Sequence, residues 1–181
     1  MKIDRHKQQM KIVLETERLI LREFTLDDTA FIIELVNTPG WLEFIGDRNI
    51  KTEEQARSYL KNGPLKSYNE NGFGLAMVQL KTEETPIGMC GILKRDNLDS
   101  PDIGFAFLPE FMGKGYAFEI ANTTLIFAKT IWQLPVVAAI TLPNNKSSIN
   151  LLKKLGLQFI KPLTFPGSTE ELMLYSTTNQ S

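Results

Sequence analysis

The chain has 181 residues, of which 43% are hydrophobic and 23% charged, and no linker or internal repeat interrupts it, which fits one compact domain. The net charge of −1, the sequence pI of about 5.9 and the lack of a Lys/Arg-rich run argue against a nucleic-acid partner. No apolar run reaches the length of a membrane span, and the single cysteine, Cys90, has no partner for an intramolecular disulfide, so we expect a cytoplasmic protein that binds no membrane.

The beginning of the chain is polar, and we expect residues 1–10 to form a flexible extension before a single domain at 11–181. This extension contains the only histidine, His6. A histidine general base, a Ser-His-Asp nucleophile and most histidine-containing zinc sites would need His6 to reach the core. We therefore expect no metal, and catalysis would have to use carboxylates, hydroxyls, backbone amides or water.

Two helices are predicted in the first third of the domain. A strand at 19–24 leads into a helix that ends near Asn37, because residues with capping chemistry precede an apolar helical face. Thr52 followed by Gln55 resembles a capping box, which predicts a second helix that ends near Lys61.

Strands and helices alternate in the rest of the chain. The expected elements are an antiparallel pair of strands at 73–80 and 86–93 joined by a turn at 81–85, a strand at 102–108, a helix after Gly115, a strand at 136–142, a helix at 147–155 that ends at Gly156, and a closing pair of strands at 159–160 and 172–175. This order predicts a mixed α/β (α+β) domain.

The most chemically informative segment is 105–117, which reads FAFLPEFMGKGYA. An apolar strand runs through a proline into Gly113-Lys114-Gly115, and a helix follows. The two glycines let the backbone turn sharply and approach a ligand closely, and the unpaired amides at the beginning of a helix favour an anion. The segment therefore predicts a phosphate-binding turn.

Two common phosphate motifs are excluded by residues at fixed spacing. A Walker loop needs a glycine where this chain has Leu108, and a serine or threonine where it has Gly115. A Rossmann fingerprint needs a glycine at Phe118 and an acid about 20 residues further on, but no Asp or Glu occurs between Glu119 and Glu170.

The same acid-free stretch is basic. A solvated lysine face would explain any one of its lysines, whereas a positive field beside the turn would attract a polyanionic small ligand. The lysines are Lys129, Lys146, Lys153, Lys154 and Lys161.

Three segments resemble the GNAT N-acetyltransferases, specifically the RimJ/RimL-type branch of ribosomal-protein alanine acetyltransferases. They are LETERLILR from Leu14, DIGFAFLPEFMGKGYAFE from Asp102 and LPNNKSSINLLKKLGL from Leu142, and the resemblance covers about residues 16–175. It implies a single-domain GNAT fold with a twisted, mostly antiparallel sheet, a splay between the fourth and fifth strands, and helices on both faces. Acetyl-coenzyme A would bind in the splay, and its pyrophosphate and ribose phosphate would be the predicted polyanion.

The resemblance also implies roles for individual residues. The strand edge at Phe107 and Leu108 would pair with the pantetheine amides of the coenzyme, and the pair Asn145 and Ser148 would lie close to the pantetheine arm and the thiol. The alternative is that Asn145 and Ser148 are only turn and cap residues and contact no ligand. The pyrophosphate would be held by backbone amides of Gly113, Lys114, Gly115, Tyr116 and Ala117.

The implied reaction is direct attack of an amine on the thioester in a ternary complex, with backbone amides stabilising the oxyanion. Asp102 is the predicted carboxylate that takes the proton through water. The alternative is that Asp102 is an exposed aspartate at the beginning of a strand and has no catalytic role. Ser148 is the candidate to steer or protonate the departing sulfur, because Leu152 stands where the wider superfamily often has a tyrosine. A site without a strong base favours an α-amino group, with a pKa of about 8, over a lysine, with a pKa of about 10.4.

Trp41 and Phe44 are the predicted acceptor-binding residues, because in this resemblance their loop covers the amine side of the splay. Aromatic residues near a helix end are also ordinary core residues. The acceptor would be a protein N-terminus or a small-molecule amine, and the enzyme a monomer or homodimer. A coenzyme A binding module without turnover, acting as a sensor or scaffold, is the alternative.

Overall fold

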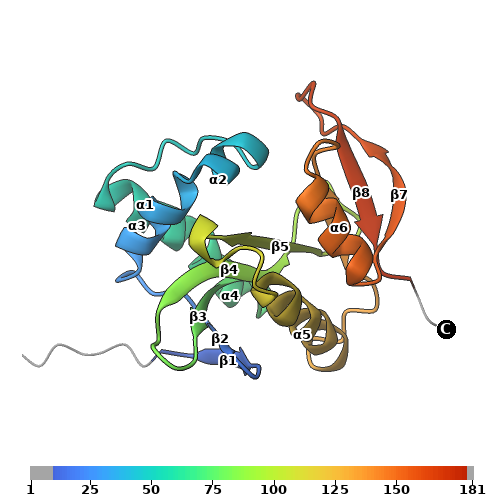
Figure 1. Ribbon diagram of the computed structural model, residues 1–181. Helices are drawn as coiled ribbons and strands as arrows, with labels where there is room; N and C mark the ends of the chain where they lie inside the picture. The colour runs from blue at the N-terminus through green and yellow to red at the C-terminus, as the bar shows by residue number, and fades with distance from the viewer. Residues whose placement is uncertain (1–9, 179–181) are drawn as a thin grey trace, which may run out of the picture.

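The computed structural model describes residues 10–178, and one eight-stranded sheet organises them in the order β1-β2-β3-β4-β5-β6-β8-β7 (Figure 1). Every neighbouring pair of strands is antiparallel except β5 and β6, which are parallel. The strands are β1 (Ile12–Glu15), β2 (Leu19–Arg22), β3 (Leu75–Leu80), β4 (Pro86–Leu93), β5 (Asp102–Phe107), β6 (Ala138–Thr141), β7 (Gln158–Leu163) and β8 (Leu172–Ser176).

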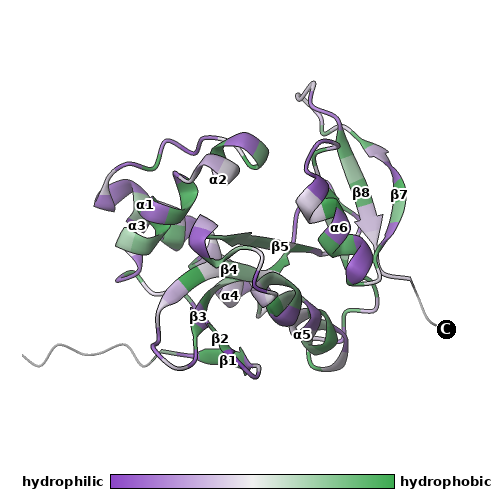
Figure 2. Ribbon diagram, viewed as in Figure 1, coloured by the Kyte–Doolittle hydropathy of each residue, from purple (hydrophilic) through white to green (hydrophobic). Residues whose placement is uncertain are grey.

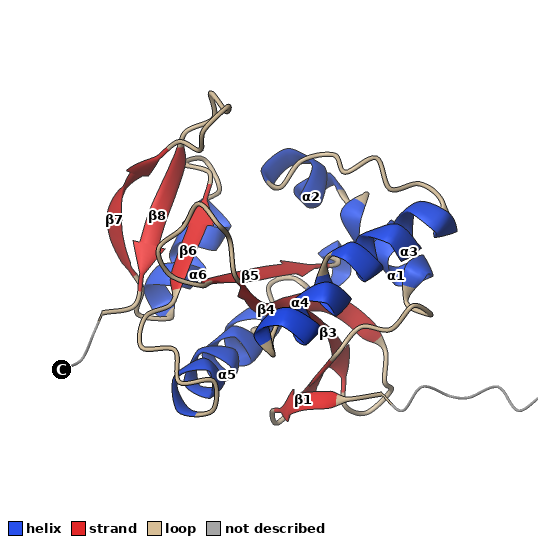
Figure 3. Ribbon diagram, turned by 180° about the vertical axis from the view of Figure 1, so that it is seen from behind, coloured by secondary structure: helices blue, strands red, loops and turns tan. Residues whose placement is uncertain are grey.

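Helices connect the strands on both sides of this sheet (Figure 3). They are α1 (Thr29–Val36), α2 (Pro39–Phe44), α3 (Glu53–Asn62), α4 (Pro64–Asn71), the short 3-10 helix η1 (Pro109–Phe111), α5 (Tyr116–Thr130) and α6 (Lys146–Lys154). None of the helices within residues 10–178 is long and apolar enough to cross a membrane. His6 and the rest of the predicted extension up to residue 9 lie outside the described part of the chain.

The predicted splay is present between β5 and β6, which are the fourth and fifth of the predicted strands. β5 pairs with β4 along all of its residues, and β6 pairs with β8 along all of its residues. The two strands pair with each other only where Asp102 lies opposite Ala138. Beyond this contact β5 stays paired with β4 and β6 stays paired with β8, so the two halves of the sheet diverge (Figure 1).

Besides the short 3-10 helix η1, three elements were not predicted from the sequence. β1 has only four residues, and it exists as a strand because it pairs with β2. The segment expected to be a loop around Trp41 forms α2, which begins with Pro39 at its first position. A second helix, α4, likewise begins with Pro64 directly after Gly63 ends α3. Short helices of this kind carry too few residues for a clear apolar period.

The capping box at the beginning of α3 is confirmed. The Thr52 side chain accepts from the Gln55 amide at 3.2 Å, and the Gln55 side chain accepts from the Thr52 amide at 3.0 Å. The helix ends with Asn62, one residue beyond the predicted Lys61.

Two apolar clusters pack against the two faces of the sheet, because successive strand residues point to opposite faces. In β3, Ala76 and Val78 join the cluster that includes α5, whereas Met77 joins the cluster that includes α1 and α3. Figure 2 shows both hydrophobic (green) and hydrophilic (purple) residues on α5. The buried side includes Ile120 and Ala121.

A buried ion pair joins the end of β2 to the beginning of α1. Arg22 donates to both carboxylate oxygens of Asp28, at 2.8 and 3.0 Å, and its Nε donates to Gln79 at 2.9 Å. The two charged side chains are 8% and 11% exposed. Asp28 also accepts from the Thr25 amide at 2.7 Å, which fixes the turn into α1.

Removing one partner of this pair should be strongly destabilising. We expect Asp28→Ala to lower the free energy of unfolding by about 3–5 kcal/mol, because Arg22 would stay buried without its counter-charge. Chemical denaturation measures the loss. The control is Glu53→Ala, which breaks the exposed pair with Arg57 and should cost about 0.5 kcal/mol or less. Equal losses in both variants would contradict this account.

Candidate active site

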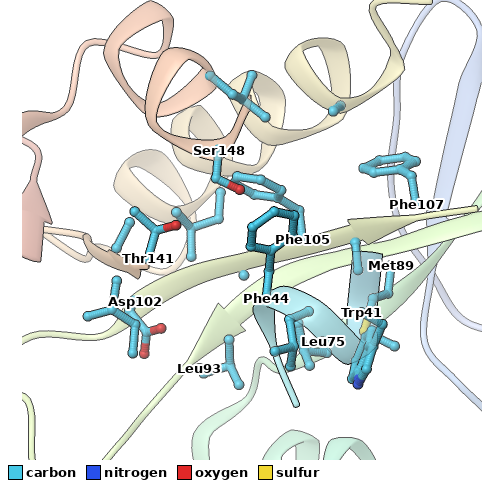
Figure 4. A pocket seen from close by; sticks show the side chains of 18 of the residues that line it. Trp41, Phe44, Leu75, Met89, Leu93, Asp102, Phe105, Phe107, Thr141 and Ser148 are labelled. Atoms are coloured by element: carbon cyan, nitrogen blue, oxygen red, sulfur yellow. The ribbon is translucent and has the colours of Figure 1, made fainter. Parts of the chain in front are cut away.

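A cavity of about 920 Å³ opens where β5 and β6 separate (Figure 4). β5, the turn after it and the beginning of α5 form one wall, and β6 and α6 form a second. α2, α3 and α4 form the end of the cavity opposite α6. The predicted site residues that line it are Trp41, Phe44, Asp102, Phe107, Gly113, Gly115, Tyr116, Ala117, Asn145 and Ser148. Leu108 and Lys114 do not line it.

The Gly-x-Gly turn has a left-handed backbone at both glycines, with φ of +72° at Gly113 and +83° at Gly115. A Cβ at Gly113 would meet no protein atom within 4 Å, so glycine is required there by backbone conformation and not by crowding inside the chain. Gly115 is the N-cap of α5, and the first helical hydrogen bond runs from the Glu119 amide to the Gly115 carbonyl at 3.0 Å. The amides of residues 116–118 consequently have no partner within the helix.

An ion pair holds this turn against the β1–β2 hairpin. Arg18 Nε donates to Glu119 at 2.7 Å, and Arg18 Nη1 donates to the Lys114 carbonyl at 3.1 Å. The guanidinium also lies 4.5 Å from the centre of the Tyr116 ring. Arg18 and Glu119 were not predicted as site residues, although Arg18 belongs to the quoted segment LETERLILR.

The Glu119 carboxylate stays charged because of these contacts. Burial raises its pKa, but hydrogen bonds from Thr16 and Arg18 outweigh burial and hold the pKa of Glu119 below its usual value. The Thr16 hydroxyl donates at 2.7 Å and the Arg18 amide at 2.9 Å. The acid in the first turn of α5 is therefore neutralised by its partner, which preserves the positive end of the helix dipole for an anion.

The open edge of β5 exposes the backbone of alternate residues. The Leu108 amide donates to the Ile87 carbonyl at 2.9 Å, so the N–H of Leu108 points toward β4. Because an antiparallel ladder alternates, Phe105 and Phe107 direct theirs toward the splay. The predicted edge contact is thus available at Phe107 but not at Leu108, whose carbonyl also accepts from Phe111 at 3.0 Å. Phe105, which sequence reasoning missed, is the other residue of this stretch whose backbone faces the splay.

Asp102 is buried, not an exposed residue at the beginning of a strand. It is 1% exposed, and both of its carboxylate oxygens accept from Arg95 Nε, at 2.9 and 3.1 Å. Burial raises the pKa of Asp102 above its usual value, and the charge and hydrogen bond of Arg95 oppose that rise only in part. A carboxylate with a raised pKa in a cavity has the property expected of a general base.

Asn145 and Ser148 have the capping role that their sequence positions allow, and they also line the cavity. The Asn145 side chain accepts from the Ser148 amide at 3.2 Å, as the N-cap of α6. Figure 4 shows the Ser148 side chain beside Phe105, and the Thr141 hydroxyl between Ser148 and Asp102. Thr141 is a cavity residue that sequence reasoning did not identify.

Trp41 and Phe44 lie on α2, at the end of the cavity that α2, α3 and α4 form. Trp41 is 5% exposed and belongs to the apolar cluster under α1 and α3, so it is both a core residue and a lining residue. Its ring N–H is buried and has no partner among the described residues. Phe44 is half-buried and extends into the cavity toward Phe105 (Figure 4).

One lysine of the basic stretch lines the cavity. Lys154, at the end of α6, has its ammonium 4.3 Å from the centre of the Phe118 ring, and both residues line the wall next to the turn. The other lysines of the stretch do not line the cavity. No group of His, Cys, Asp and Glu side chains that could hold a metal ion occurs within residues 10–178.

Three comparisons identify relatives of this chain. The family model described as Acetyltransferase (GNAT) domain matches residues 18–158. The protein named Uncharacterized N-acetyltransferase YnaD of Bacillus subtilis (strain 168) is 27% identical over 145 residues, which are 80% of this chain and 82% of the relative.

Solved structures share the fold. A ribosomal-protein-S5-alanine acetyltransferase from Vibrio fischeri superposes with a TM-score of 0.76 at 21% identity, over 92% of this chain and 96% of its own. The microcin C7 self immunity acetyltransferase MccE, solved with acetyl-CoA and AMP, superposes with a TM-score of 0.72 at 16% identity, over 89% and 92% of the two chains. Because the family model spans most of the described residues, including the turn and the splay, this chain belongs to the GNAT acetyltransferases, a family of acyltransferases.

Proposed function

We propose that residues 11–181 form a single acetyltransferase domain that transfers an acetyl group from acetyl-coenzyme A to a primary amine, by direct attack in a ternary complex. The acceptor is a protein N-terminus or a small-molecule amine, and the enzyme works in the cytoplasm as a monomer or homodimer. The observation that carries this proposal is that the phosphate-binding turn and the open edge of β5 line one cavity. A pyrophosphate at the turn would direct an extended pantetheine arm along that edge.

The donor would be bound mainly by the main chain. The amides of residues 113–117, at the positive end of α5, would hold the pyrophosphate, and Lys154 would add a charge beside it. Phe105 and Phe107 would pair with the pantetheine amides and offer a backbone N–H to the developing oxyanion. Asn145 would fix the beginning of α6, where the Ser148 hydroxyl is available to the departing sulfur.

Asp102 would receive the proton of the attacking amine through water. Its raised pKa brings the carboxylate closer to the pKa of an α-amino group than an exposed aspartate would be. Arg95 would keep the ionised form available, because its Nε donates to both carboxylate oxygens. The test of the whole proposal is acetyl-coenzyme A consumption across a panel of peptides and small amines. Coenzyme binding without transfer to any amine would favour the non-catalytic module.

A pair of glycine variants tests the turn. Gly113 and Gly167 both have a positive φ, +72° and +80°, and a Cβ at either would meet no protein atom within 4 Å. Gly113→Ala and Gly167→Ala should therefore lose similar stability, about 1 kcal/mol each. Only Gly113→Ala should weaken acetyl-coenzyme A binding, by about tenfold or more, because its methyl group would point at the ligand.

Calorimetric titration measures the two dissociation constants. Lys114→Ala is a second control and should change the affinity little, because the Lys114 side chain does not line the cavity. Equal losses of affinity in Gly113→Ala and Gly167→Ala, or a larger loss in Lys114→Ala, would remove the turn from the binding site.

Asp102→Asn should separate activity from stability. We expect kcat to fall by about 10²-fold or less, because a water-mediated base would be lost. Stability at pH 7 should not fall. A folded pKa above the unfolded one means that the stabilising form of Asp102 is the protonated one, which is lost as pH rises through the folded pKa. Asparagine imitates that neutral form.

Denaturation of both proteins at several pH values checks this sign. The free energy of unfolding of Asp102→Asn should equal or exceed that of the unaltered protein at pH 7. The difference should shrink as pH falls through the raised folded pKa of Asp102 and become constant below about 3.9, the ordinary pKa of aspartate. A loss at pH 7 as large as that of Asp28→Ala would mean that Asp102 is a structural partner of Arg95 instead.

A further inference from the structure

The acceptor end of the cavity is formed by α2, α3, α4, Arg48 between α2 and α3, residues 94–96 after β4, and Asp102 at the beginning of β5. It has no surplus of negative charge. Two of its carboxylates are already paired: Asp102 with Arg95 at 2.9 Å and Glu70 with Lys66 at 3.7 Å. A polyamine carries several ammonium groups and would need several unpaired carboxylates there. The ionisable lining residues are Arg48, Lys66, Lys94 and Arg95 against Glu70, Asp96 and Asp102.

Two guanidinium groups and a phenol gather at this end. Tyr59 projects from α3 and is half-buried, and Arg48 and Arg95 are both near enough for their charge to favour its ionised form. Burial outweighs them and raises the pKa of Tyr59, so its hydroxyl remains a neutral hydrogen-bond donor at pH 7. Arg48 is exposed, and no ion pair recorded within residues 10–178 involves it.

Arg95 uses only part of its hydrogen-bonding capacity. Its Nε donates to Asp102, whereas Nη1 and Nη2 make no hydrogen bond recorded among the described residues. A guanidinium has five N–H donors in a planar fork that matches a carboxylate. A second carboxylate could therefore bind to the same guanidinium, on the side away from Asp102.

We propose that the acceptor is an amine that carries a carboxylate, held by Arg48, Tyr59 and Arg95 while its amino group lies toward Asp102 and the open edge of β5. This inference rests on the proposed function and narrows its acceptor. It argues against polyamines, because this end of the cavity has no surplus of negative charge to bind them, and it favours amino acids or acidic peptides. Because Arg95 would contact both the acceptor carboxylate and Asp102, binding the correct acceptor would also position the base.

The first experiment compares acceptors that differ in one group. Initial rates with acetyl-coenzyme A would be measured for ω-amino acids of increasing length and for their carboxamides, with spermidine as a polycationic acceptor. We expect each productive amino acid to exceed its amide by about tenfold or more in kcat/KM, since a hydrogen bond to a charged group contributes about 1.5–3 kcal/mol. Peptides with glutamate or glutamine as the second residue distinguish a side-chain carboxylate from that of a free amino acid.

The second experiment places the preference on named residues. Arg48→Gln and Tyr59→Phe should raise KM for carboxylate acceptors by about tenfold and leave KM for the amides nearly unchanged. Arg48→Lys should restore part of the preference. Arg57→Gln is the matched control, because Arg57 lies on α3 but does not line the cavity. Acetyl-coenzyme A affinity, measured separately, should be the same in all four variants.

The outcomes distinguish the two proposals. Amides or spermidine acetylated as well as the amino acids would overturn the carboxylate proposal and leave the acetyltransferase proposal standing. Failure to bind acetyl-coenzyme A would refute the proposed function itself. If no amine were acetylated, titration of the same amino acids and amides into coenzyme A-loaded protein would decide, and equal binding of the two would overturn the carboxylate site.

Discussion

The single contact between β5 and β6, where Asp102 lies opposite Ala138, is the constraint on which the rest of the site depends. Because β5 follows β4 and β6 follows β8, one sheet separates into two halves without losing their other pairings. The separation leaves backbone groups of Phe105 and Phe107 unpaired inside the molecule, where an extended ligand can satisfy them. The cavity therefore results from the topology of the sheet.

A second requirement is that the Gly-x-Gly turn keeps its position at the end of β5. Two left-handed glycines shape it, and the Arg18–Glu119 pair ties it to the β1–β2 hairpin across the sequence. The same pair offsets the repulsion that the Glu119 charge, in the first turn of α5, would exert on an anion at the turn. Stability and electrostatics at this turn thus depend on residues that would not contact the ligand.

The two arginine–aspartate ion pairs of the described residues illustrate different uses of one interaction. Arg22 and Asp28 bind each other through two hydrogen bonds and fix the beginning of α1. Arg95 meets Asp102 through one nitrogen only, lines the cavity, and leaves the pKa of Asp102 raised. The first arrangement stabilises the charge of Asp28. The second leaves the ionised form of Asp102 energetically unfavourable, so its carboxylate is suited to accept a proton.

The sequence by itself determined the order of the long elements, the capping box at Thr52 and the Gly-x-Gly turn before α5, because each depends on local periodicity or on glycine and cap chemistry at fixed spacing. Short elements such as α2 and α4 lacked that local signal. Only the tertiary structure decided that Asp102 is buried beside Arg95 and that Phe105, not Leu108, shares the open edge with Phe107. It also brought Arg48 and Tyr59 to the same end of the cavity as Arg95. These properties depend on which neighbours surround a residue, and those neighbours come from segments that are distant in the sequence.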